Sequence, residues 1–349
     1  MTLPTVDRAN ISDKRVFVRA DIDIPLDHGK ITDDTRLRDS WPTIKYLLDL
    51  NCTVVLAGHL GRPEGRVVPE LSSKPVAQWL GERIKYNVSS IKGDEKTEKV
   101  VLTQEISGFV VSPKLTVLEN LRFDPKEEAN NPDFARQLAD LADVYVNESF
   151  ASIEREHASV VGVPKFLPHY AGFRLAKEVK VLTGILEEPQ RPLVVIIGGA
   201  KLETKVPVIA KMFEHAEQLI LGGKILTEDL GRYKDDSKLK LLQLTADAKD
   251  TTLESIDKVA DVIARASTII WNGPLGAIED INYQVGTKRL VELIITNQAA
   301  YKVVGGGDTI GFLNKIGLTN KFNWVSSGGG SMLKLLSDEE LVGIAALLK

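Results

Sequence analysis

The feature that most constrains the fold of this chain is a regular alternation of short apolar runs with longer segments of helical periodicity. Several runs are apolar at consecutive positions, which is typical of parallel strands covered on both faces. Helices are expected between them, for example at Pro132–Leu141, Lys205–Ala216, Ile256–Ala266 and Thr287–Thr296. The alternation predicts βαβ units and an α/β fold with parallel sheets. The expected strands are Arg15–Arg19, Thr53–Ala57, Leu115–Leu118, Val144–Val146, Leu193–Ile197, Leu219–Leu221, Thr268–Trp271, Lys302–Val304 and Asn323–Val325.

The chain has 349 residues, a length that fits about two domains. The alternation pauses at Phe173–Leu186, which has the pattern of one long helix, and a polar stretch with Pro189 follows it. We therefore expect an N-terminal domain over 1–170, a connecting helix over 171–187, a C-terminal domain over 188–335 and a C-terminal segment over 336–349.

Composition narrows the class of protein. The net charge of -4 argues against general binding to nucleic acid or to an anionic membrane. The single cysteine, Cys52, excludes an intrachain disulfide and fits a reducing cytoplasm. Met1–Arg15 lacks the apolar core of a signal peptide, and no apolar stretch approaches the ~18 residues that a membrane span needs. We expect a cytoplasmic protein that binds neither membrane nor nucleic acid.

In the second half, glycines follow five of the expected strands. Such turns allow a backbone to approach a ligand closely, and helix N-termini beside them suit phosphate groups. One glycine pair alone is more often a tight turn, but five at the carboxyl ends of parallel strands favour a nucleotide site. The turns are Gly198-Gly199-Ala200-Lys201, Gly222-Gly223, Asn272-Gly273-Pro274, Gly305-Gly306-Gly307-Asp308-Thr309 and Gly328-Gly329-Gly330-Ser331.

Two other nucleotide-binding motifs do not fit. The chain lacks the G-x-x-x-x-G-K-[ST] pattern of the P-loop, and GGGDTI lacks the glycine spacing of the dinucleotide fingerprint. Lys201 and Lys205 are four residues apart and would share a face at the start of a helix. Two cations there oppose the helix dipole unless an anion lies between them. A solvated helix surface remains the alternative.

The first half carries a different set of residues near its strand ends. Arginine suits bidentate recognition of carboxylate or phosphate, so these residues favour a basic pocket for an acidic, phosphorylated small molecule. His59 alone could be structural, but it follows a buried strand in the sequence GHLGRP. The set consists of Asp21, Asp23, Arg36, His59, Arg62, Arg122, Asn147 and Arg155.

In this order, the motifs closely resemble those of the phosphoglycerate kinase family. The matching stretches cover both halves and nearly the whole chain. They are VRADIDIPL, ITDDTRL, GHLGRPEG, VLENLRF, DVYVNESFASIEREHAS, GGAKLETK, WNGPLGAIE, GGGDT and SSGGGSMLKLL.

The resemblance implies two Rossmann-like domains that face an interdomain cleft, with the C-terminal segment packing back on the N-terminal domain. It also implies magnesium-dependent, reversible phosphoryl transfer from 1,3-bisphosphoglycerate to ADP. The N-terminal domain would bind 3-phosphoglycerate through Asp21, Asp23, Arg36, His59, Arg62, Arg122 and Arg155. The C-terminal domain would bind ATP or ADP through Gly199, Ala200, Lys201, Lys205, Gly223, Asn272, Pro274, Glu279, Gly306, Gly307, Asp308 and Thr309.

Within that site, the resemblance gives Arg36, Lys201, Gly307 and Gly330 catalytic roles and makes Asp308 the magnesium ligand. A loose, metaphosphate-like transition state is stabilised mainly by positioning and charge. The substrate carboxylate is already ionised, so no general base is required. A non-catalytic phosphate-binding scaffold is the alternative, although such a scaffold need not retain Lys201, Arg36 and Asp308. We expect a monomer.

This sequence departs from the family pattern at four places. Asp23 stands where the family usually has asparagine, and Glu154-Arg155-Glu156-His157 replaces the sequence HRAH. Gly222-Gly223-Lys224 replaces a GGGM-like turn, and the region between Gly223 and Trp271 is short. There, Asp250-Thr251-Thr252-Leu253 stands in for an Asp-Ile-Gly-Pro turn. These differences affect the expected substrate charge balance and the base pocket rather than the phosphate site.

Overall fold

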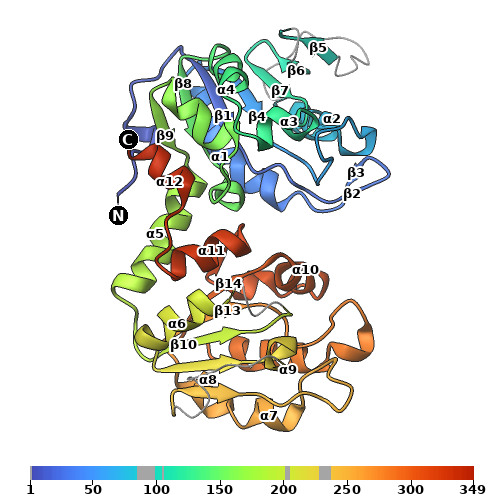
Figure 1. Cartoon of the computed structure of the whole chain (residues 1–349), viewed down its shortest axis with the longest axis vertical. Helices are drawn as coiled ribbons and strands as arrows, with labels where there is room; N and C mark the ends of the chain where they lie inside the picture. Colours follow the sequence, from blue (N-terminus) through green and yellow to red (C-terminus); the bar gives the residue numbers. More distant parts are fainter. Residues whose placement is uncertain (1, 85–98, 104–105, 201–204, 228–236) are drawn as a thin grey trace. The chain divides into compact units, whose positions relative to one another are not determined.

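The computed structural model describes residues 2–84, 99–103, 106–200, 205–227 and 237–349. The chain forms two compact units (Figure 1). Unit 1 consists of Met1–Glu178 together with Leu341–Lys349, and unit 2 consists of Val179–Glu340. The final helix, α12 (Val342–Leu347), contacts β9 of unit 1, and the Gly343 amide donates to the Ile153 carbonyl at 2.9 Å.

Unit 1 is built on a seven-stranded sheet in the order β5-β6-β7-β4-β1-β8-β9. The five strands from β7 to β9 are parallel, and β5 and β6 form an antiparallel edge. The strands are β1 (Arg15–Arg19), β4 (Thr53–Ala57), β5 (Lys99–Val101), β6 (Ser107–Ser112), β7 (Leu115–Leu118), β8 (Val144–Asn147) and β9 (His169–Ala171). A separate hairpin joins β2 (Leu26–Asp27) to β3 (Lys30–Ile31).

Two helices of unit 1 begin at residues whose side chains cap them. Asp124 caps α3 by accepting from the Lys126 amide, and Asn131 caps α4 by accepting from the amides of Asp133 and Phe134. Proline follows each cap, at a position where its missing N–H costs nothing. The helices are α1 (Thr35–Asp49), α2 (Lys74–Ile84), α3 (Pro125–Glu128), α4 (Pro132–Ala139) and α5 (Phe173–Glu187), which runs on into unit 2.

Unit 2 has a six-stranded, fully parallel sheet in the order β12-β11-β10-β13-β14-β15. The first strand of the unit, β10, lies in the middle of the sheet. The chain adds β11 and β12 on one side of it and then β13, β14 and β15 on the other, so the direction in which strands are added reverses between β10 and β13. Ligands of doubly wound sheets bind at this switch point, beyond the carboxyl ends of the strands. The strands are β10 (Leu193–Ile197), β11 (Gln218–Leu221), β12 (Leu239–Leu241), β13 (Thr268–Asn272), β14 (Tyr301–Gly305) and β15 (Trp324–Val325).

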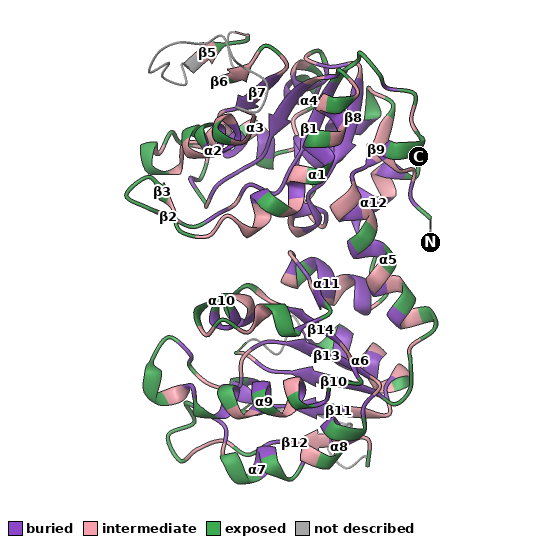
Figure 2. Cartoon of the chain, turned by 180° about the vertical axis from the view of Figure 1, so that it is seen from behind, coloured by how far each residue is buried: buried purple, intermediate pink, exposed green. Residues whose placement is uncertain are grey.

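The central strands are buried along their length, as consecutive apolar residues require (Figure 2). In unit 2, helices cover both faces of the sheet (Figure 1). They are α6 (Val206–His215), α7 (Leu253–Asp257), α8 (Ala260–Arg265), α9 (Val285–Thr296), α10 (Gly307–Lys315) and α11 (Gly329–Leu336). None of the helices in the described ranges is long and apolar enough to span a membrane.

The predicted α/β class with parallel sheets in two domains is confirmed, and the nine predicted strands agree with the structure to within one residue at each end. One helix prediction is wrong. Ile256–Ala266 is split between α7 and α8 because the Val259 amide bonds to the carbonyl of Ile256, three residues back, which tightens the turn. The helix predicted from Lys205 begins instead at Val206.

Candidate functional site

Unit 1 gathers polar side chains at the carboxyl ends of three parallel strands. Arg19 ends β1, Asn147 ends β8, and His59 follows β4 by two residues. Because β1 lies between β4 and β8, these three ends meet at one edge of the sheet. All three side chains are buried.

Asp21 and Arg36 form an ion pair at this edge. Nη1 of Arg36, the second residue of α1, donates to Oδ1 of Asp21 at 2.8 Å. Burial raises the pKa of Asp21, and the positive charge of Arg36 opposes that shift. The negative charge of Asp21 in turn raises the pKa of Arg36, so the guanidinium remains charged. The pair holds one cation in place at the start of α1.

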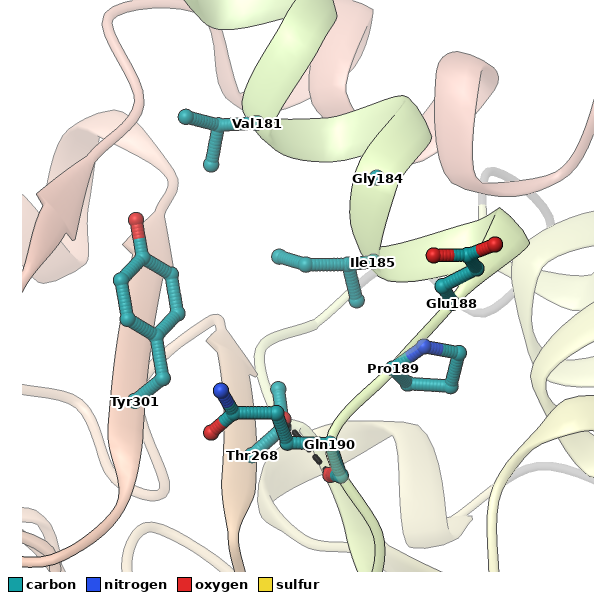
Figure 3. A pocket seen from close by; sticks show the side chains of 8 residues that line it. All are labelled: Val181, Gly184, Ile185, Glu188, Pro189, Gln190, Thr268 and Tyr301. Carbon is teal, nitrogen blue, oxygen red and sulfur yellow. Dashed lines mark hydrogen bonds between the residues drawn. The ribbon is translucent and has the colours of Figure 1, made fainter.

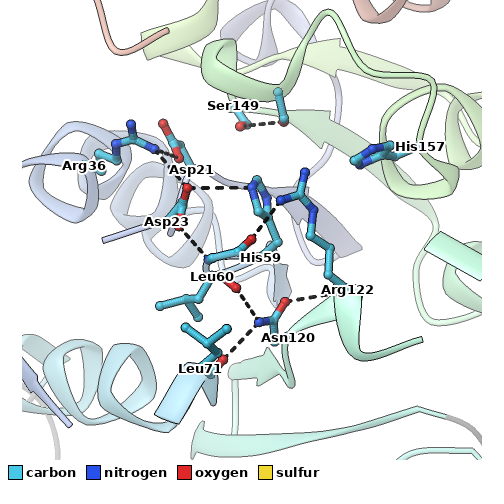
Figure 4. Close-up of polar contacts among 12 residues, drawn as sticks. Asp21, Asp23, Arg36, His59, Leu60, Leu71, Asn120, Arg122, Ser149 and His157 are labelled. Atoms are coloured by element: carbon cyan, nitrogen blue, oxygen red, sulfur yellow. Dashed lines mark hydrogen bonds and ion pairs between the residues drawn. The ribbon is translucent and has the colours of Figure 1, made fainter. Parts of the chain in front are cut away.

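Asp23 uses one carboxylate oxygen for a backbone amide and turns the other toward Arg36 and His59. Oδ1 accepts from the Gly61 amide at 2.8 Å, which fixes the loop after β4. Oδ2 lies 4.0 Å from Nη1 of Arg36 and 3.9 Å from Nε2 of His59 (Figure 4). The carboxylate therefore lies between Arg36 and His59.

His59 accepts a hydrogen bond at Nδ1 from Nη2 of Arg19, at 2.9 Å. Burial lowers the pKa of His59 well below its usual value, and the charges of Arg19, Arg122 and Arg155 lower it further. His59 is consequently neutral at physiological pH.

Arg122 contacts the loop after β4 and the side chain of Glu128. Its Nη1 donates to the Gly61 carbonyl at 2.8 Å, and its Nε lies 2.9 Å from Oε1 of Glu128. Asn120 fixes the same region by donating to the carbonyls of Leu60 and Leu71 at 2.8 and 3.0 Å (Figure 4). Nη2 of Arg122 is buried with no hydrogen-bond partner among the described residues, so it remains available to an anion.

The remaining predicted residues of unit 1 differ in their surroundings. Arg155 is half-buried, and its Nε has no hydrogen-bond partner in the described parts of the chain. Arg62 is exposed. His157 is buried near Glu127, and burial together with the charges of Arg122, Arg19 and Arg155 lowers its pKa to about 3. The structure thus joins Asp21, Asp23, Arg36 and His59 through side-chain contacts and connects Arg122 to Asp23 through the backbone of Gly61, with Arg155 close enough to affect His59 electrostatically.

In unit 2, the glycine turns after β10 and β13 pack directly on one another. The Gly198 amide donates to the Asn272 carbonyl at 2.9 Å, and the Gly199 amide donates to the Pro274 carbonyl at 2.7 Å. Gly273 has φ of +93°, and a Cβ there would lie 2.4 Å from the Gly198 carbonyl oxygen. Only glycine fits at this position, which lies at the switch point of the sheet.

Lys205 lies immediately before α6 and reaches back into this junction. Its Nζ donates to the Gly198 carbonyl, and a Cβ added at Gly199 would lie 2.6 Å from Nζ. Burial lowers the pKa of Lys205 to about 8, and the negative charge of Asp308 opposes that shift. The prediction for Lys201 lies outside the described residues.

Two further helices begin beside these turns. Gly306, with φ of +100°, precedes α10, and a Cβ on Gly329, the first residue of α11, would lie 2.6 Å from the Gly306 Cα. Nδ2 of Asn272 and Oγ of Ser331 are buried there without a hydrogen-bond partner among the described residues. Helix N-termini and uncompensated donors together favour an anionic ligand.

The other predicted residues of unit 2 differ in their burial and contacts. Thr309 is buried and accepts from the Gly273 amide at 3.1 Å, whereas Asp308 is exposed in the first turn of α10. The Gly223 amide donates to Oγ1 of Thr251 at 3.4 Å, so the turn at Asp250-Thr251 lies beside the end of β11. Ala200, Glu279, Gly307 and Gly330 are exposed.

A pocket of about 210 Å³ lies elsewhere in unit 2. It includes Thr268 and Tyr301, the first residues of β13 and β14, and therefore lies at the amino ends of the strands. Ligands of doubly wound sheets bind at the opposite ends, so we assign no part of the reaction to it. The lining residues are Val181, Gly184, Ile185, Glu188, Pro189, Gln190, Thr268 and Tyr301 (Figure 3).

Two residues that build the site, Arg19 and Asn120, are absent from the predicted set, and the contacts of a third, Asp250, were not predicted. Arg19 could have been found, because a charged residue that ends an otherwise apolar strand needs a partner at the strand end. Asn120 gave no such signal, and Asp250 was expected only as part of the turn Asp250-Thr251-Thr252-Leu253. Asp250 is buried, accepts from the Gly286 amide at 3.0 Å and orders the turn beside Gly223. Both are polar residues in irregular segments, where only tertiary contacts define their partners.

Comparisons with known proteins agree on one family. The family model described as phosphoglycerate kinase matches residues 6–230 and 228–339. A phosphoglycerate kinase of Herpetosiphon aurantiacus is 37% identical and one of Leptospira biflexa is 34% identical, with at least 99% of each chain covered. These alignments span 396 positions, more than the 349 residues of this chain, so the relatives carry insertions.

Solved structures give the same result. The structure of phosphoglycerate kinase from Coxiella burnetii has a TM-score of 0.81 and 30% identity, with 99% of both chains covered. The structure of phosphoglycerate kinase from Pyrococcus horikoshii has a TM-score of 0.79 and 25% identity, with 100% of this chain and 98% of that chain covered.

Proposed function

The chain belongs to the phosphoglycerate kinase family, and on this premise we propose which of its residues carry out the reaction. It is a phosphotransferase that moves a phosphoryl group reversibly between 1,3-bisphosphoglycerate and ADP, giving 3-phosphoglycerate and ATP. The assignment of substrates to the two units and of roles to single residues is our proposal.

We propose that unit 1 binds 3-phosphoglycerate. This substrate carries a carboxylate and a phosphate, so a site with several fixed cations suits it. Arg36 and Arg122 are held by the contacts described above, and Arg155 lies nearby. His59 is neutral and adds a donor rather than a charge. Asp21 orients Arg36, Asp23 orders the loop after β4, and the exposed Arg62 contributes at the rim.

We propose that unit 2 binds the phosphates of ATP or ADP at its switch point. The support comes from the turns at Gly199, Gly223, Gly273 and Gly306, from the start of α10, and from Lys205 with its buried ammonium group. Asn272 and Thr309 would fix the turns that contact the phosphates, with Pro274 and Gly307 beside them. Ala200 and Glu279 would face the nucleoside, and Lys201 would contact the transferred group.

The residues present also fit a magnesium ion. No group of three or more His, Cys, Asp or Glu in the described ranges could hold a metal by itself. Magnesium in phosphoryl transfer, however, is commonly bound by one or two carboxylates and completed by substrate phosphates. Asp308 is an exposed carboxylate beside the phosphate turns and suits that role. The ion would neutralise charge on the phosphate oxygens.

The chemistry then requires little beyond positioning. In the direction of ATP use, a carboxylate oxygen of 3-phosphoglycerate attacks the terminal phosphorus, and the bond to the bridging oxygen of ADP breaks. The nucleophile is already ionised, so no proton must be removed. We propose that Arg36 and Lys201 bind the equatorial oxygens of the transferring group, and that amides at Gly307 and Gly330 add donors. These groups act most strongly where charge spreads in the transition state.

One observation supports the proposal most directly. The same small part of unit 2 contains two adjacent helix N-termini, a lysine of lowered pKa and the buried, unpaired Nδ2 of Asn272. Helix N-termini and a buried ammonium group attract a negative charge, and an unpaired buried donor needs an acceptor, so a nucleotide phosphate suits all of them.

A coupled assay of ATP-dependent 3-phosphoglycerate phosphorylation on the purified chain tests the proposal. Arg36→Ala is expected to lower kcat by about 100-fold or more, because its charge acts in the transition state. Arg38→Ala is the matched control: Arg38 lies on the same helix, is more than half exposed and pairs with Asp34, so its loss should leave kcat within about threefold of wild type. Loss of activity in both variants, or in neither, would contradict the role of Arg36.

Lys201→Ala extends the test to the other substrate. We expect a fall in kcat of about 100-fold with a smaller change in the KM for nucleotide. We also propose that the enzyme acts in the cytoplasm, which fits its single, buried cysteine, and that it is a monomer. Light scattering with and without substrates measures the oligomeric state.

A further inference from the structure

Hydrogen bonds link four residues next to the proposed substrate site, each at least 95% buried: His59, Arg19, Ser159 and Glu127. Arg19, at the end of β1, lies at their centre and uses each guanidinium nitrogen. Nη1 donates to the Ala20 carbonyl at 2.5 Å, Nη2 bonds to Nδ1 of His59 at 2.9 Å, and Nε donates to Oγ of Ser159 at 2.9 Å. The side chain is thereby fixed in one orientation.

Ser159 connects Arg19 to a buried carboxylate. Its hydroxyl accepts from Arg19 and donates to Oε1 of Glu127 at 2.5 Å, while its backbone amide donates to Oε2 of Glu127 at 3.0 Å. Glu127 lies in α3, and Ser159 lies in the helical turn Ala158–Gly162. Neither residue belongs to the proposed substrate-binding set.

The direction of these bonds determines the state of His59. A guanidinium group can only donate, so Nδ1 of His59 must accept and carries no proton. A neutral imidazole then has its single proton on Nε2. That nitrogen points toward Oδ2 of Asp23, 3.9 Å away, on the side where Arg36 lies (Figure 4).

We propose that Glu127 and Ser159 are positioning residues for substrate binding, which act by holding Arg19 so that His59 is locked in the tautomer with its proton on Nε2. The inference rests on the proposed function in one respect, namely that His59 contacts 3-phosphoglycerate. In this tautomer, His59 offers N–H to an anionic oxygen. The other tautomer would direct a lone pair at the same anion and repel it.

The carboxylate of Glu127 has a second effect in the same arrangement. Arg19 is fully buried, and a buried cation needs a nearby counter-charge. Glu127, linked to Arg19 through Ser159, contributes to it, because the charge of Arg19 opposes the rise in the pKa of Glu127 that burial causes. Glu127 thereby adds to the negative charge of Asp21, which also lies near Arg19.

Histidine side-chain NMR of the full chain labelled with ¹⁵N tests the proposal in the absence of substrate. The chain has five histidines, and His59→Gln identifies the signals of His59. In the wild type, we expect Nδ1 to be unprotonated and Nε2 to carry the proton. In Ser159→Ala, Arg19 loses its link to Glu127, so His59 should become a mixture of tautomers, and the KM for 3-phosphoglycerate should rise about tenfold with a smaller change in kcat.

Two more variants separate positioning from loss of stability. Ser73→Ala removes an equally buried serine hydroxyl, which donates to the Leu118 carbonyl and does not contact Arg19, and should leave the tautomer and KM unchanged. Glu127→Gln preserves the shape of Glu127 but removes its charge and one acceptor oxygen. It should shift the tautomer of His59 as Ser159→Ala does. It keeps the test available if Ser159→Ala does not fold.

Each outcome bears on one part of the inference. A proton on Nδ1 in the wild type overturns it, as does an unchanged tautomer in both Ser159→Ala and Glu127→Gln, whatever happens to KM. A shifted tautomer with unchanged KM supports the positioning role but contradicts the proposed contact between His59 and 3-phosphoglycerate. A shifted tautomer with raised KM supports both.

Discussion

Asp23 accepts a backbone hydrogen bond with one carboxylate oxygen and directs the other toward Arg36 and His59. Through Oδ1 it holds the Gly61 amide, and through Oδ2 it adds negative charge near Arg36 and His59. An asparagine could retain the first function, because its carbonyl oxygen also accepts. Only the charge, which opposes an anionic substrate, would be lost.

We therefore predict that Asp23→Asn leaves kcat intact and lowers the KM for 3-phosphoglycerate by about threefold. Steady-state kinetics at saturating ATP measure both constants. Asp27→Asn, which removes an exposed carboxylate on β2, controls for the change in net charge. A tenfold rise in KM would show that the carboxylate assists binding, by orienting Arg36.

Single residues also show how far the sequence can predict the site. Asp21, Arg36 and His59 were identifiable because charged groups beside apolar strands are unusual, and parallel strands bring their carboxyl ends together. Ser159 and Glu127 were not. A serine before an apolar run and a glutamate in a polar helix give no signal until the fold places their oxygens 2.5 Å apart, with the serine bonded to Arg19.

At the scale of elements, the helix α5 begins on a buried carboxylate. Glu148, directly after β8, accepts from the Arg174 amide and from the hydroxyl of Thr43 on α1, and that hydroxyl accepts from the Phe173 amide. Three elements of unit 1 thus meet at Glu148. Burial raises its pKa from the usual 4.5 to about 8, despite these donors and the charge of Arg174.

The raised pKa predicts a pH dependence of stability. Between about pH 4.5 and 8 the unfolded chain releases this proton and the folded chain retains it, so the contribution of Glu148 to stability falls as the pH rises. Glutamine cannot titrate. Relative to wild type, Glu148→Gln should gain about 2–4 kcal/mol of unfolding free energy between pH 5 and pH 8.5.

Urea denaturation of both proteins at the two pH values measures this change. Glu156→Gln removes an exposed carboxylate of the same unit and serves as the control for charge. An equal stability difference between Glu148→Gln and wild type at pH 5 and pH 8.5 would show that Glu148 does not titrate in this range.

The elements themselves were largely predictable, for a physical reason. Strands such as Leu193–Ile197 are buried on both faces and have no polar positions, so their pattern has few other interpretations. Prediction of an element fails where tertiary packing or a local hydrogen bond, rather than periodicity, determines the structure. The strand β6, next to the edge strand β5, has mixed burial, and α7 and α8 are separated by a local hydrogen bond that periodicity does not show.

At the scale of the whole molecule, this chain is a shortened member of its family. Alignments with its relatives span 396 positions against its 349 residues, and the family resemblance predicts that the segment between Gly223 and Trp271 is short, with Thr252 and Leu253 in the places of glycine and proline. The turn at Asp250-Thr251 still reaches Gly223 and the Leu275 carbonyl. The phosphate turns are thus supported, while less chain remains to enclose a base.

We predict that ADP and GDP, and likewise ATP and GTP, differ by less than about a hundredfold in kcat/KM, because a loosely enclosing apolar slot discriminates by only ~1–3 kcal/mol. Steady-state kinetics with the four nucleotides at saturating magnesium give the ratios. Adenine preference beyond about a thousandfold would mean that the short segment still forms a specific base pocket.

The division of the chain into units also affects the order in which the protein can fold during synthesis. Unit 2 is one continuous stretch, whereas unit 1 takes in Leu341–Lys349, which the ribosome makes only after all of unit 2. Domains tend to fold as they emerge. While unit 2 is being made, unit 1 therefore lacks α12, and the surface that α12 will cover stays exposed. Unit 2 can complete its fold before unit 1 does.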